Sequence, residues 1–598
     1  MSNNQTVSID NILTKDDLAD QLLTMYIDWD GRKTNWVSEK MEIQRYILAT
    51  DTTTTTNAKL PWKNKTTIPK ICQIRDNLHA NYRAAIFPKR KWLRWESSTA
   101  EDQVKGKTKA IEAYMENVLD RPEFKREISK MLYDYIDYGN VIASIDWIDE
   151  TEISEDSMSQ KAGYVGPVPR RLSPLDVVFN PIAPSFNRTG KFVRSLMSFG
   201  DFAAKVEQNT AADDIESAKD ILDYMHGIRS QVASVSGKYE VKNDILNISG
   251  FVDFTSYLGS GYVEVITYFG DYYNVEKRQL FRNRVVTIVD RHRIVSDIPN
   301  PSSISSDNIW HTGWRIRQDS LWAMGPLDNL VGMQYRIDHL ENLKADVFDL
   351  IAAPPLMIKG DVEDFEWGPF AKVYVGEEGD VKLLAPDVNA LNANLEIANL
   401  QNQMEEMAGS PKEAMGFRTP GEKTMYEVQR LENAAARIFA TKITQFEEDI
   451  LEPMLNAMLE MATRKMSNAT IRMLDNEQNV VNFLTITKDD ISGSGRIRPM
   501  AARNFAERAE LVQNLNTFFV QSIGTDQDIK VHFSSIKLAK MFEDILDIEK
   551  YGVVSPYIRL SEQQEALQLQ NAGEEQTQME AMTPSGLTPD DTSEEITV

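Results

Sequence analysis

Apolar residues recur every three to four positions in several long stretches of the chain. This spacing places them on one face of an α-helix. The pattern predicts helices over these ranges: 14–48, 68–87, a pair within 102–138 that closes at Gly139, 200–232, 326–352, 389–408, 424–465, 500–522 and 535–550. Pro453 lies inside the longest pattern and should distort that helix, because proline lacks the N–H group that the helix needs.

Strand-like runs gather between the helical regions. They are rich in Val, Ile, Tyr and Trp and are separated by proline and glycine, which is typical of strands. The predicted strands are 141–148, 175–180, 192–198, 263–273, 282–295 and 308–315, with further short strands within 356–388 and 470–487. The expected fold class is therefore α+β and mainly helical.

The length of 598 residues exceeds what one hydrophobic core supports, so several domains are expected. No apolar run approaches the roughly 18 residues of a membrane span, so no membrane partner is expected. The only cysteine, Cys72, excludes an internal disulfide and a cysteine-based metal cluster. The net charge of −25 argues against a general nucleic-acid coat, because tight DNA binding needs Lys and Arg against phosphate.

The stretch GFRTPGEKT, residues 416–424, comes close to a phosphate-binding loop. Gly416 and Gly421 have the spacing of the motif G-x-x-x-x-G-K-[ST], but Glu422 separates Gly421 from Lys423. A working loop of this kind follows a strand, whereas a helix is predicted here before the stretch. The added carboxylate would also lie beside any bound phosphate. A nucleotide site is therefore the weaker interpretation.

A turn followed by a capped helix explains the same stretch more simply. Pro420 and Gly421 favour the turn, and Thr424 and Glu427 form the T-x-x-E pattern of a capping box. None of the six histidines has the H-x-x-x-H or H-E-x-x-H spacing, and no G-x-S-x-G motif is present. No catalytic residue, metal site or cofactor is therefore predicted, and the chain is not expected to be an enzyme.

Basic and aromatic residues alternate in FPKRKWLRWE, residues 87–96. The cluster contains Lys89, Arg90, Lys91, Trp92, Arg94 and Trp95. One interpretation is contact with nucleic acid through phosphates and stacked bases. The favoured one is an edge strand after Pro88 with its tryptophans inward, because alternation alone produces this pattern.

Several stretches follow one another in an order that matters more than any single motif. They are LPWKNKTTIPKICQIRDNLHANYRAAIFP, DYIDYGNVIASIDW, LSPLDVVFNP, WAMGPLDNLVGMQYRIDHLENLKADVFDLIAAPPLMIKG and GEKTMYEVQRLENAAARIFATKITQFEEDILEPML. Between about residues 60 and 550 this order resembles the portal protein, or head-to-tail connector, of tailed double-stranded DNA bacteriophages of the podovirus type. Met425 departs from the alanine common in that family, a conservative change for a helix.

The resemblance implies a structural and mechanical role. Portal proteins form rings at one capsid vertex, and the resemblance implies a homo-dodecamer for this chain. DNA would be packaged and ejected through the central channel of the ring without being tightly bound. The implied partners are the terminase large subunit, then the head-tail adaptor, and the major capsid or scaffold protein. The ring would be made in the bacterial cytoplasm and lie at the head-tail junction of the virion.

The resemblance also divides the chain into consecutive parts. They are an N-terminal helix and arm (1–60), wing (61–325), stem helix (326–353), clip (354–388), second stem helix (389–408), tunnel loop (409–423), long helix with a wing β segment (424–498), crown helices (499–554) and an acidic tail (555–598). Long helices would surround the channel, and their acidic wall would repel the DNA backbone.

Two groups of site residues follow from these parts. The clip would contact partner proteins through Asp361, Glu363, Asp364, Glu366 and Trp367. The tunnel loop would contact passing DNA through Lys412, Arg418 and Lys423. Two other functions stay open, namely a nucleotide-dependent motor that uses the loop at 416–424 and another oligomeric component of the virion.

Overall fold

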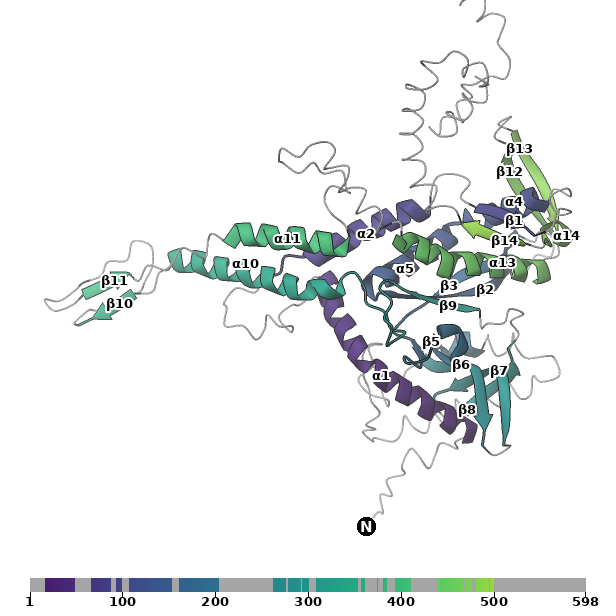
Figure 1. The fold of residues 1–598 in the computed structure, drawn as a ribbon, viewed down its shortest axis with the longest axis horizontal. Helices are drawn as coiled ribbons and strands as arrows, with labels where there is room; N and C mark the ends of the chain where they lie inside the picture. The colour runs from purple at the N-terminus through teal and green to yellow at the C-terminus, as the bar shows by residue number, and fades with distance from the viewer. Residues whose placement is uncertain are drawn as a thin grey trace, which may run out of the picture. The chain divides into compact units, whose positions relative to one another are not determined.

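The computed structural model describes most of the chain between residues 17 and 499 (Figure 1). The described ranges are 17–48, 66–87, 93–98, 107–152, 161–203, 262–275, 278–291, 293–300, 308–352, 356–360, 374, 380–383, 393–409, 439, 441–465, 468–475, 480–493 and 495–499. They contain helices and several small antiparallel sheets, so the predicted α+β class is confirmed.

The chain divides into two compact units. The first comprises Met1–Met473 with Phe483–Phe505, and the second comprises Leu474–Asn482 with Ala506–Val598. The main core, the helix-hairpin-helix segment and the basic hollow described below all belong to the first unit. The predicted helices at 500–522 and 535–550, the acidic tail and most of the predicted helix at 200–232 lie outside the described residues.

The helices expected in the first third of the chain are present. They are α1 (Asp17–Leu48), α2 (Lys70–Ile86), α4 (Lys107–Leu119) and α5 (Pro122–Asp137). Gly139 follows α5 with a φ of 66°, a backbone conformation that glycine adopts at little cost. A Cβ atom there would also lie 2.3 Å from the backbone nitrogen of Gly325. The predicted stop at Gly139 thus has both a conformational and a steric cause.

Two antiparallel sheets form the central β structure. One has the order β4-β5-β6-β7-β8, built from Val177–Phe179, Lys191–Ser198, Tyr262–Asn274, Gln279–Val289 and Arg293–Pro299. The other has the order β3-β2-β9, built from Lys161–Leu172, Asn140–Glu152 and Ile309–Gly313. The run 282–295 was predicted as one strand, and this is wrong: Asp290 and Arg291 have positive φ values and turn the chain between β7 and β8.

Strand β3 is the longest element that the sequence pattern missed. It pairs with β2 so that Pro167 faces Trp147 and Pro169 faces Ile145. The two prolines are two residues apart, so their missing N–H groups fall on the same side of the strand. Because β3 is an edge strand, that side can face away from the sheet without breaking the pairing.

Helix α1 covers one face of the five-stranded sheet. Tyr26 of α1 meets Phe192 of β5 edge-to-face, with 5.5 Å between ring centroids. Leu22 and Tyr268 are buried in the same cluster. The amphipathic face predicted for this long helix is therefore the face that packs on the sheet.

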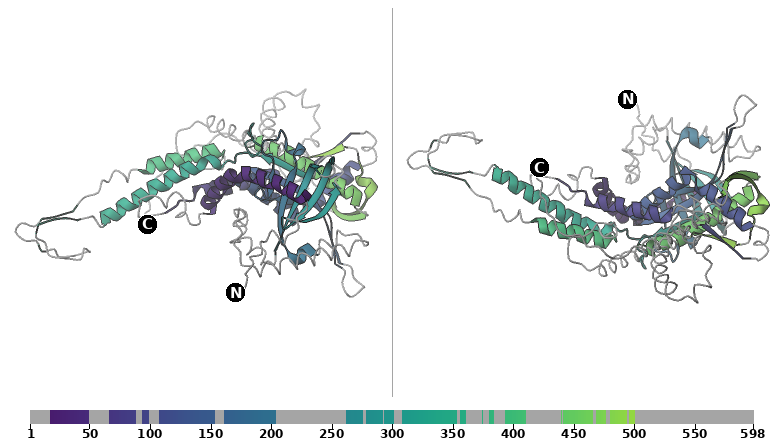
Figure 2. Two further views of the ribbon diagram at one scale, coloured as in Figure 1. Left: turned by 90° about the horizontal axis from the view of Figure 1, so that it is seen from below. Right: turned by 90° about the horizontal axis from the view of Figure 1, so that it is seen from above.

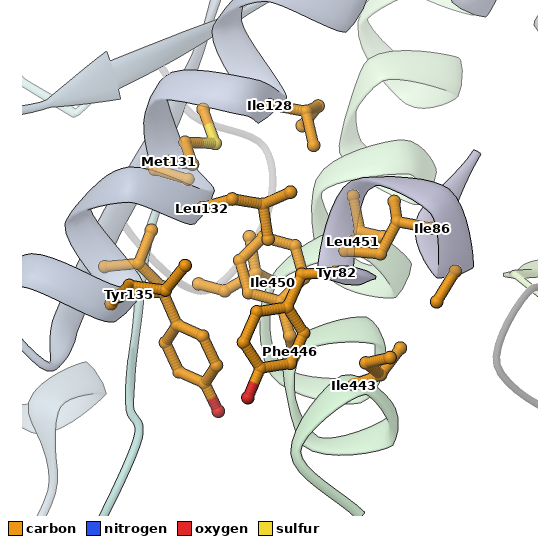
Figure 3. Packing of buried hydrophobic residues seen from close by; sticks show 14 of the residues in the cluster. Tyr82, Ile86, Ile128, Met131, Leu132, Tyr135, Ile443, Phe446, Ile450 and Leu451 are labelled. Atoms are coloured by element: carbon orange, nitrogen blue, oxygen red, sulfur yellow. The ribbon is translucent and has the colours of Figure 1, made fainter. Parts of the chain in front are cut away.

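The largest core lies where α2 and α5 meet the helical segment around residues 443–451 (Figure 3). Tyr82, Tyr135 and Phe446 point toward one another in this core. The buried hydroxyl of Tyr82 accepts a hydrogen bond of 3.0 Å from the indole N–H of Trp314. Three segments far apart in the sequence are thus held by one apolar cluster.

The predicted distortion at Pro453 takes the form of a π-helical segment, η9 (Glu447–Leu451), directly before α13 (Glu452–Lys465). The N–H of Glu452 bonds the carbonyl of Glu447, five residues earlier. Because Pro453 has no backbone N–H, it cannot donate the next hydrogen bond of an α-helix. A single turn of π-helix accommodates the missing hydrogen bond. Residues 424–438 of the predicted long helix lie outside the described residues.

One of the two tryptophans of the basic and aromatic cluster, Trp95, is directed inward. Trp95 lies in β1 (Leu93–Ser97), which pairs with β14 (Gly495–Pro499), and only 5% of its surface is exposed. Arg94, its neighbour on the strand, is exposed. The described part of the cluster thus agrees with the strand interpretation, while residues 88–92 lie outside it. The remaining short elements are η4 (Phe186–Arg188), η6 (Asp328–Leu330), β12 (Asn468–Asp475), β13 (Val480–Thr487) and α14 (Lys488–Ile491).

Candidate functional site

The described residues between 331 and 409 form a helix-hairpin-helix segment. Its parts are α10 (Val331–Ala352), β10 (Leu356–Lys359), β11 (Asp380–Leu383) and α11 (Asn394–Ala408). β10 and β11 pair antiparallel, with Leu356 opposite Leu383. Figures 1 and 2 show α10 and α11 side by side. Their polar contacts include Lys344 Nζ to Asn394 Oδ1 at 3.0 Å and Arg336 to Glu396 at 3.2 Å.

Glycine again marks the end of this segment. Gly409 has a φ of 72° and its N–H contacts the carbonyls of Glu405 and Glu406. This left-handed C-cap satisfies carbonyl groups that would otherwise lack partners at the helix end. The local sequence therefore ends α11 where the predicted tunnel loop begins.

A ladder of buried polar side chains fixes the base of α10. Gln334, Asp338 and Asn342 follow at intervals of four residues, which places them on one helix face. Asn342 accepts from the Thr66 N–H (2.7 Å) and donates to the Thr66 carbonyl (3.1 Å). Asp338 accepts from the Ile68 N–H (3.0 Å), and Gln334 donates to the Ile68 carbonyl (2.5 Å). The three side chains thus bind the chain entering α2 much as a neighbouring strand would.

A buried ion pair fixes the other helix of the segment. Lys70, the first residue of α2, lies 2.5 Å from a carboxylate oxygen of Glu405 in α11. The side chains are only 7% and 4% exposed. Lys70 also donates to Gln73 at 2.9 Å. Both helices of the segment are therefore tied to the same end of α2.

A third buried contact joins α1 to the approach of α10. The ammonium of Lys40 in α1 pairs with Asp328 of η6, and Asp328 also accepts the Gly325 N–H at 2.9 Å. Burial lowers the pKa of Lys40, and the nearby carboxylate of Asp328 counteracts part of that shift. The root of the segment is thus built from largely buried polar contacts to both N-terminal helices.

The segment also exposes large apolar side chains. They are Phe348, Leu350, Ile351, Met357, Ile358, Tyr374, Leu395 and Met407. Leu395 is 73% exposed and Phe348 is 54% exposed. Contiguous exposed apolar patches are typical of a surface that another molecule covers, so these side chains are candidates for such a surface. The arrangement suits assembly through protein-protein contacts.

No family model and no curated protein sequence matches this chain. The inference of function therefore depends on the fold and on the helix-hairpin-helix segment. Among the described residues, no helix is long and apolar enough to cross a membrane. Within those same ranges, no three His, Cys, Asp or Glu side chains gather in a way that could hold a metal ion.

The site residues predicted from the sequence lie outside the described residues. This applies to the clip residues Asp361, Glu363, Asp364, Glu366 and Trp367, to the tunnel-loop residues Lys412, Arg418 and Lys423, and to the capping pair Thr424 and Glu427. In the sequence, the clip residues fall between β10 and β11, and the loop residues follow α11. Their predicted roles stay predictions.

The polar ladder was not predicted from the sequence. A regular spacing was present, because Gln334, Asp338 and Asn342 recur at a constant interval of four among the other polar residues of the helix. Four-residue spacing marks one helix face, so a buried polar stripe could have been expected. Its partner at residues 66–68 could not, since nothing local links two segments more than 260 positions apart.

Proposed function

We propose that this chain is the portal subunit of a tailed double-stranded DNA bacteriophage. The observation that carries the proposal is the helix-hairpin-helix segment. α10, the hairpin β10–β11 and α11 occupy the ranges that the resemblance assigns to stem, clip and stem. They are followed by the proposed tunnel loop at 409–423.

Exposed apolar residues on this segment favour a ring of copies. Neighbouring subunits of a ring meet through two different faces of the chain. The ring closes when the rotation from each copy to the next, repeated around the axis, returns to the first copy. Phe348 and Leu395 would then be covered by the neighbouring copies. The root contacts at Lys70 and Asn342 would hold the segment at a constant angle, which a closed ring requires of every subunit.

The charge balance fits a channel through which DNA passes. With 90 acidic and 65 basic residues, the chain as a whole repels a phosphate backbone. Such repulsion keeps double-stranded DNA from adhering to the wall. The proposed ring would lie at the head-tail junction of the virion, with terminase, the head-tail adaptor and the capsid or scaffold protein as partners.

Electron microscopy of the purified full-length chain tests the proposal. The expected result is a ring with a channel wide enough for duplex DNA, and native mass spectrometry would give the number of subunits. A solid or filamentous assembly would instead support another virion component. Saturable ATP binding that is lost in Lys423→Ala would support a nucleotide-dependent motor and count against the portal.

A separate experiment tests the tunnel loop within this proposal. Substituting Lys412, Arg418 and Lys423 together by alanine should reduce the amount of DNA packaged or retained in particles. Rings of normal appearance would show that assembly is intact. Normal packaging and retention in that triple variant would remove the loop from the proposal.

A further inference from the structure

A hollow lined by basic side chains lies between α2 and the start of α5. Its volume is about 570 Å³. Its lining includes Arg83, Asp120, Lys125, Arg126, Lys130 and Tyr133. Four of these side chains are cationic and one is acidic, in a chain whose net charge is −25. The local charge therefore has the opposite sign to that of the whole chain.

Two of the cations are free to meet an external anion. Within the described ranges, neither Arg83 nor Arg126 forms an ion pair, and both are exposed. Lys125 pairs with Asp120 at 2.7 Å and Lys130 pairs with Glu127 at 2.6 Å. Asp120 is 84% exposed and Lys125 is 41% exposed, whereas Glu127 is only 20% exposed. Ion pairs between exposed side chains contribute only about 0–1 kcal/mol, so a phosphate can compete with Asp120 for Lys125.

One wall of the hollow is held by stacked and hydrogen-bonded side chains. The ring of Tyr133 stacks on His79, with 3.7 Å between centroids and an interplanar angle of 3°. The guanidinium of Arg75 lies 4.2 Å from the same ring and is held by both carboxylate oxygens of Asp137, at 2.7 and 2.8 Å. His79 also contacts the hydroxyl of Ser129 at 2.9 Å. Little ordering of this wall would be needed on binding.

We propose that this hollow binds the backbone phosphates of double-stranded DNA. The inference rests on the proposed function, in which DNA passes through the assembled ring. Arg126 and Lys130 are four residues apart on α5, a rise of about 6 Å along the helix. One DNA strand presents a phosphate about every 3.4 Å of its axis, so a duplex along α5 meets more than one cation.

The contact should be weak and sensitive to salt. The guanidinium groups of Arg83 and Arg126 can each hold a phosphate through two parallel N–H donors. The acidic remainder of the chain opposes a close approach of DNA, which limits the affinity. This combination allows DNA to be guided and released rather than retained.

The test measures binding of the full-length chain to a fluorescent DNA duplex by anisotropy at several salt concentrations. The variant R83A/R126A should bind at least about tenfold more weakly at low salt. The slope of log K against log salt should become shallower by about 2, because each lost phosphate contact removes about 0.9. The control R32A/R170A removes two half-exposed arginines outside the hollow and should leave affinity within about twofold.

Two results would overturn the inference. An equal loss of affinity in both double variants would mean that overall charge, not the hollow, attracts DNA. Unchanged binding in R83A/R126A would exclude the hollow directly. Circular dichroism should first show that the variants fold, and if the alanine pair does not, the single variant R126E at an exposed helix position carries the same test.

Microscopy of the same preparations separates this inference from the proposed function. Rings that lose DNA binding in R83A/R126A support both. Rings with unchanged DNA binding overturn only the hollow, whereas absence of rings in the unmodified chain overturns the portal proposal and with it the premise of this inference. Loss of rings in R83A/R126A would identify the hollow as a contact between copies and overturn its assignment to DNA.

Discussion

Lys70 and Glu405 are 335 positions apart in the sequence, yet their charged groups lie 2.5 Å apart at the root of the helix-hairpin-helix segment. Both side chains are almost fully buried. A buried charge without its partner is far less stable than the same charge in water. This one contact therefore joins the start of α2 to the end of α11.

Removing one partner should destabilise the protein strongly. We expect Lys70→Met to lower the free energy of unfolding by about 3–5 kcal/mol, because the buried carboxylate of Glu405 loses this ammonium. The double variant K70M/E405L should recover most of that loss. Urea unfolding measures both. Lys382→Met, which breaks the exposed pair with Asp380, should change stability by less than about 1 kcal/mol, and an equal effect would contradict the prediction.

The polar ladder predicts a second loss of stability. Asn342→Ala removes both hydrogen bonds to the backbone of Thr66. Leaving such groups without partners costs about 1–3 kcal/mol. The control is Gln403→Ala, which truncates an exposed polar side chain on α11. Limited proteolysis near residue 66 should accelerate only in the Asn342 variant. Equal cleavage rates in the two variants would show that the ladder does not anchor this part of the chain.

Two glycines should respond to alanine in opposite directions. Gly139→Ala places a Cβ against the backbone of Gly325 at a φ of 66°, so a large loss of thermal stability is expected. Gly31 lies within α1, and a Cβ atom added there would have no neighbouring atom within 4 Å. Gly31→Ala should therefore stabilise the protein by about 0.5–1 kcal/mol. Melting temperatures that shift the same way in both would refute this account.

The buried carboxylate of Glu264 predicts a pH dependence. Burial by itself would raise its pKa, but Arg291 and Arg194, at 2.6 and 2.5 Å, hold the pKa below its usual value. The folded state thus favours the ionised form, so this stabilisation is complete above the unfolded pKa of about 4.3. It is lost as the pH falls from there through the folded pKa.

Unfolding by urea between neutral pH and pH 3 checks the sign. The unmodified chain should lose stability as the pH falls below the unfolded pKa of Glu264. Glu264→Gln should be less stable at pH 7 by about 3–5 kcal/mol and should show a smaller loss on acidification. A variant with the same pH dependence as the unmodified chain would exclude Glu264 as the source.

The exposed apolar residues predict how assembly can be prevented. The variant F348Q/I351Q should shift the mass in light scattering from an oligomer toward a monomer, because the covered surface becomes polar. The control I182Q/I316Q alters two apolar residues outside the helix-hairpin-helix segment that are even more exposed. Assembly lost in both variants, or in neither, would rule out a specific role for this surface.

The sequence by itself determined most of the helices and strands within the described ranges. Helix α1, helix α10 and the strands β5 and β6 follow from periodic apolar residues, since local spacing reports which face is buried. The end of a helix at Gly139 and the distortion before Pro453 were also predicted from the sequence, because glycine and proline act on the local backbone. Alternation also predicted that Trp95 points inward.

Tertiary structure alone decided which segments meet. Strand β3 escaped the pattern because Pro167 and Pro169 disfavour strands except at an edge, and only the assembled sheet makes β3 an edge. The contacts of Asn342 and Glu405 with the start of α2, and the basic hollow, join residues distant in the chain. Local spacing encodes burial, but the partner of a buried polar group is chosen by the fold.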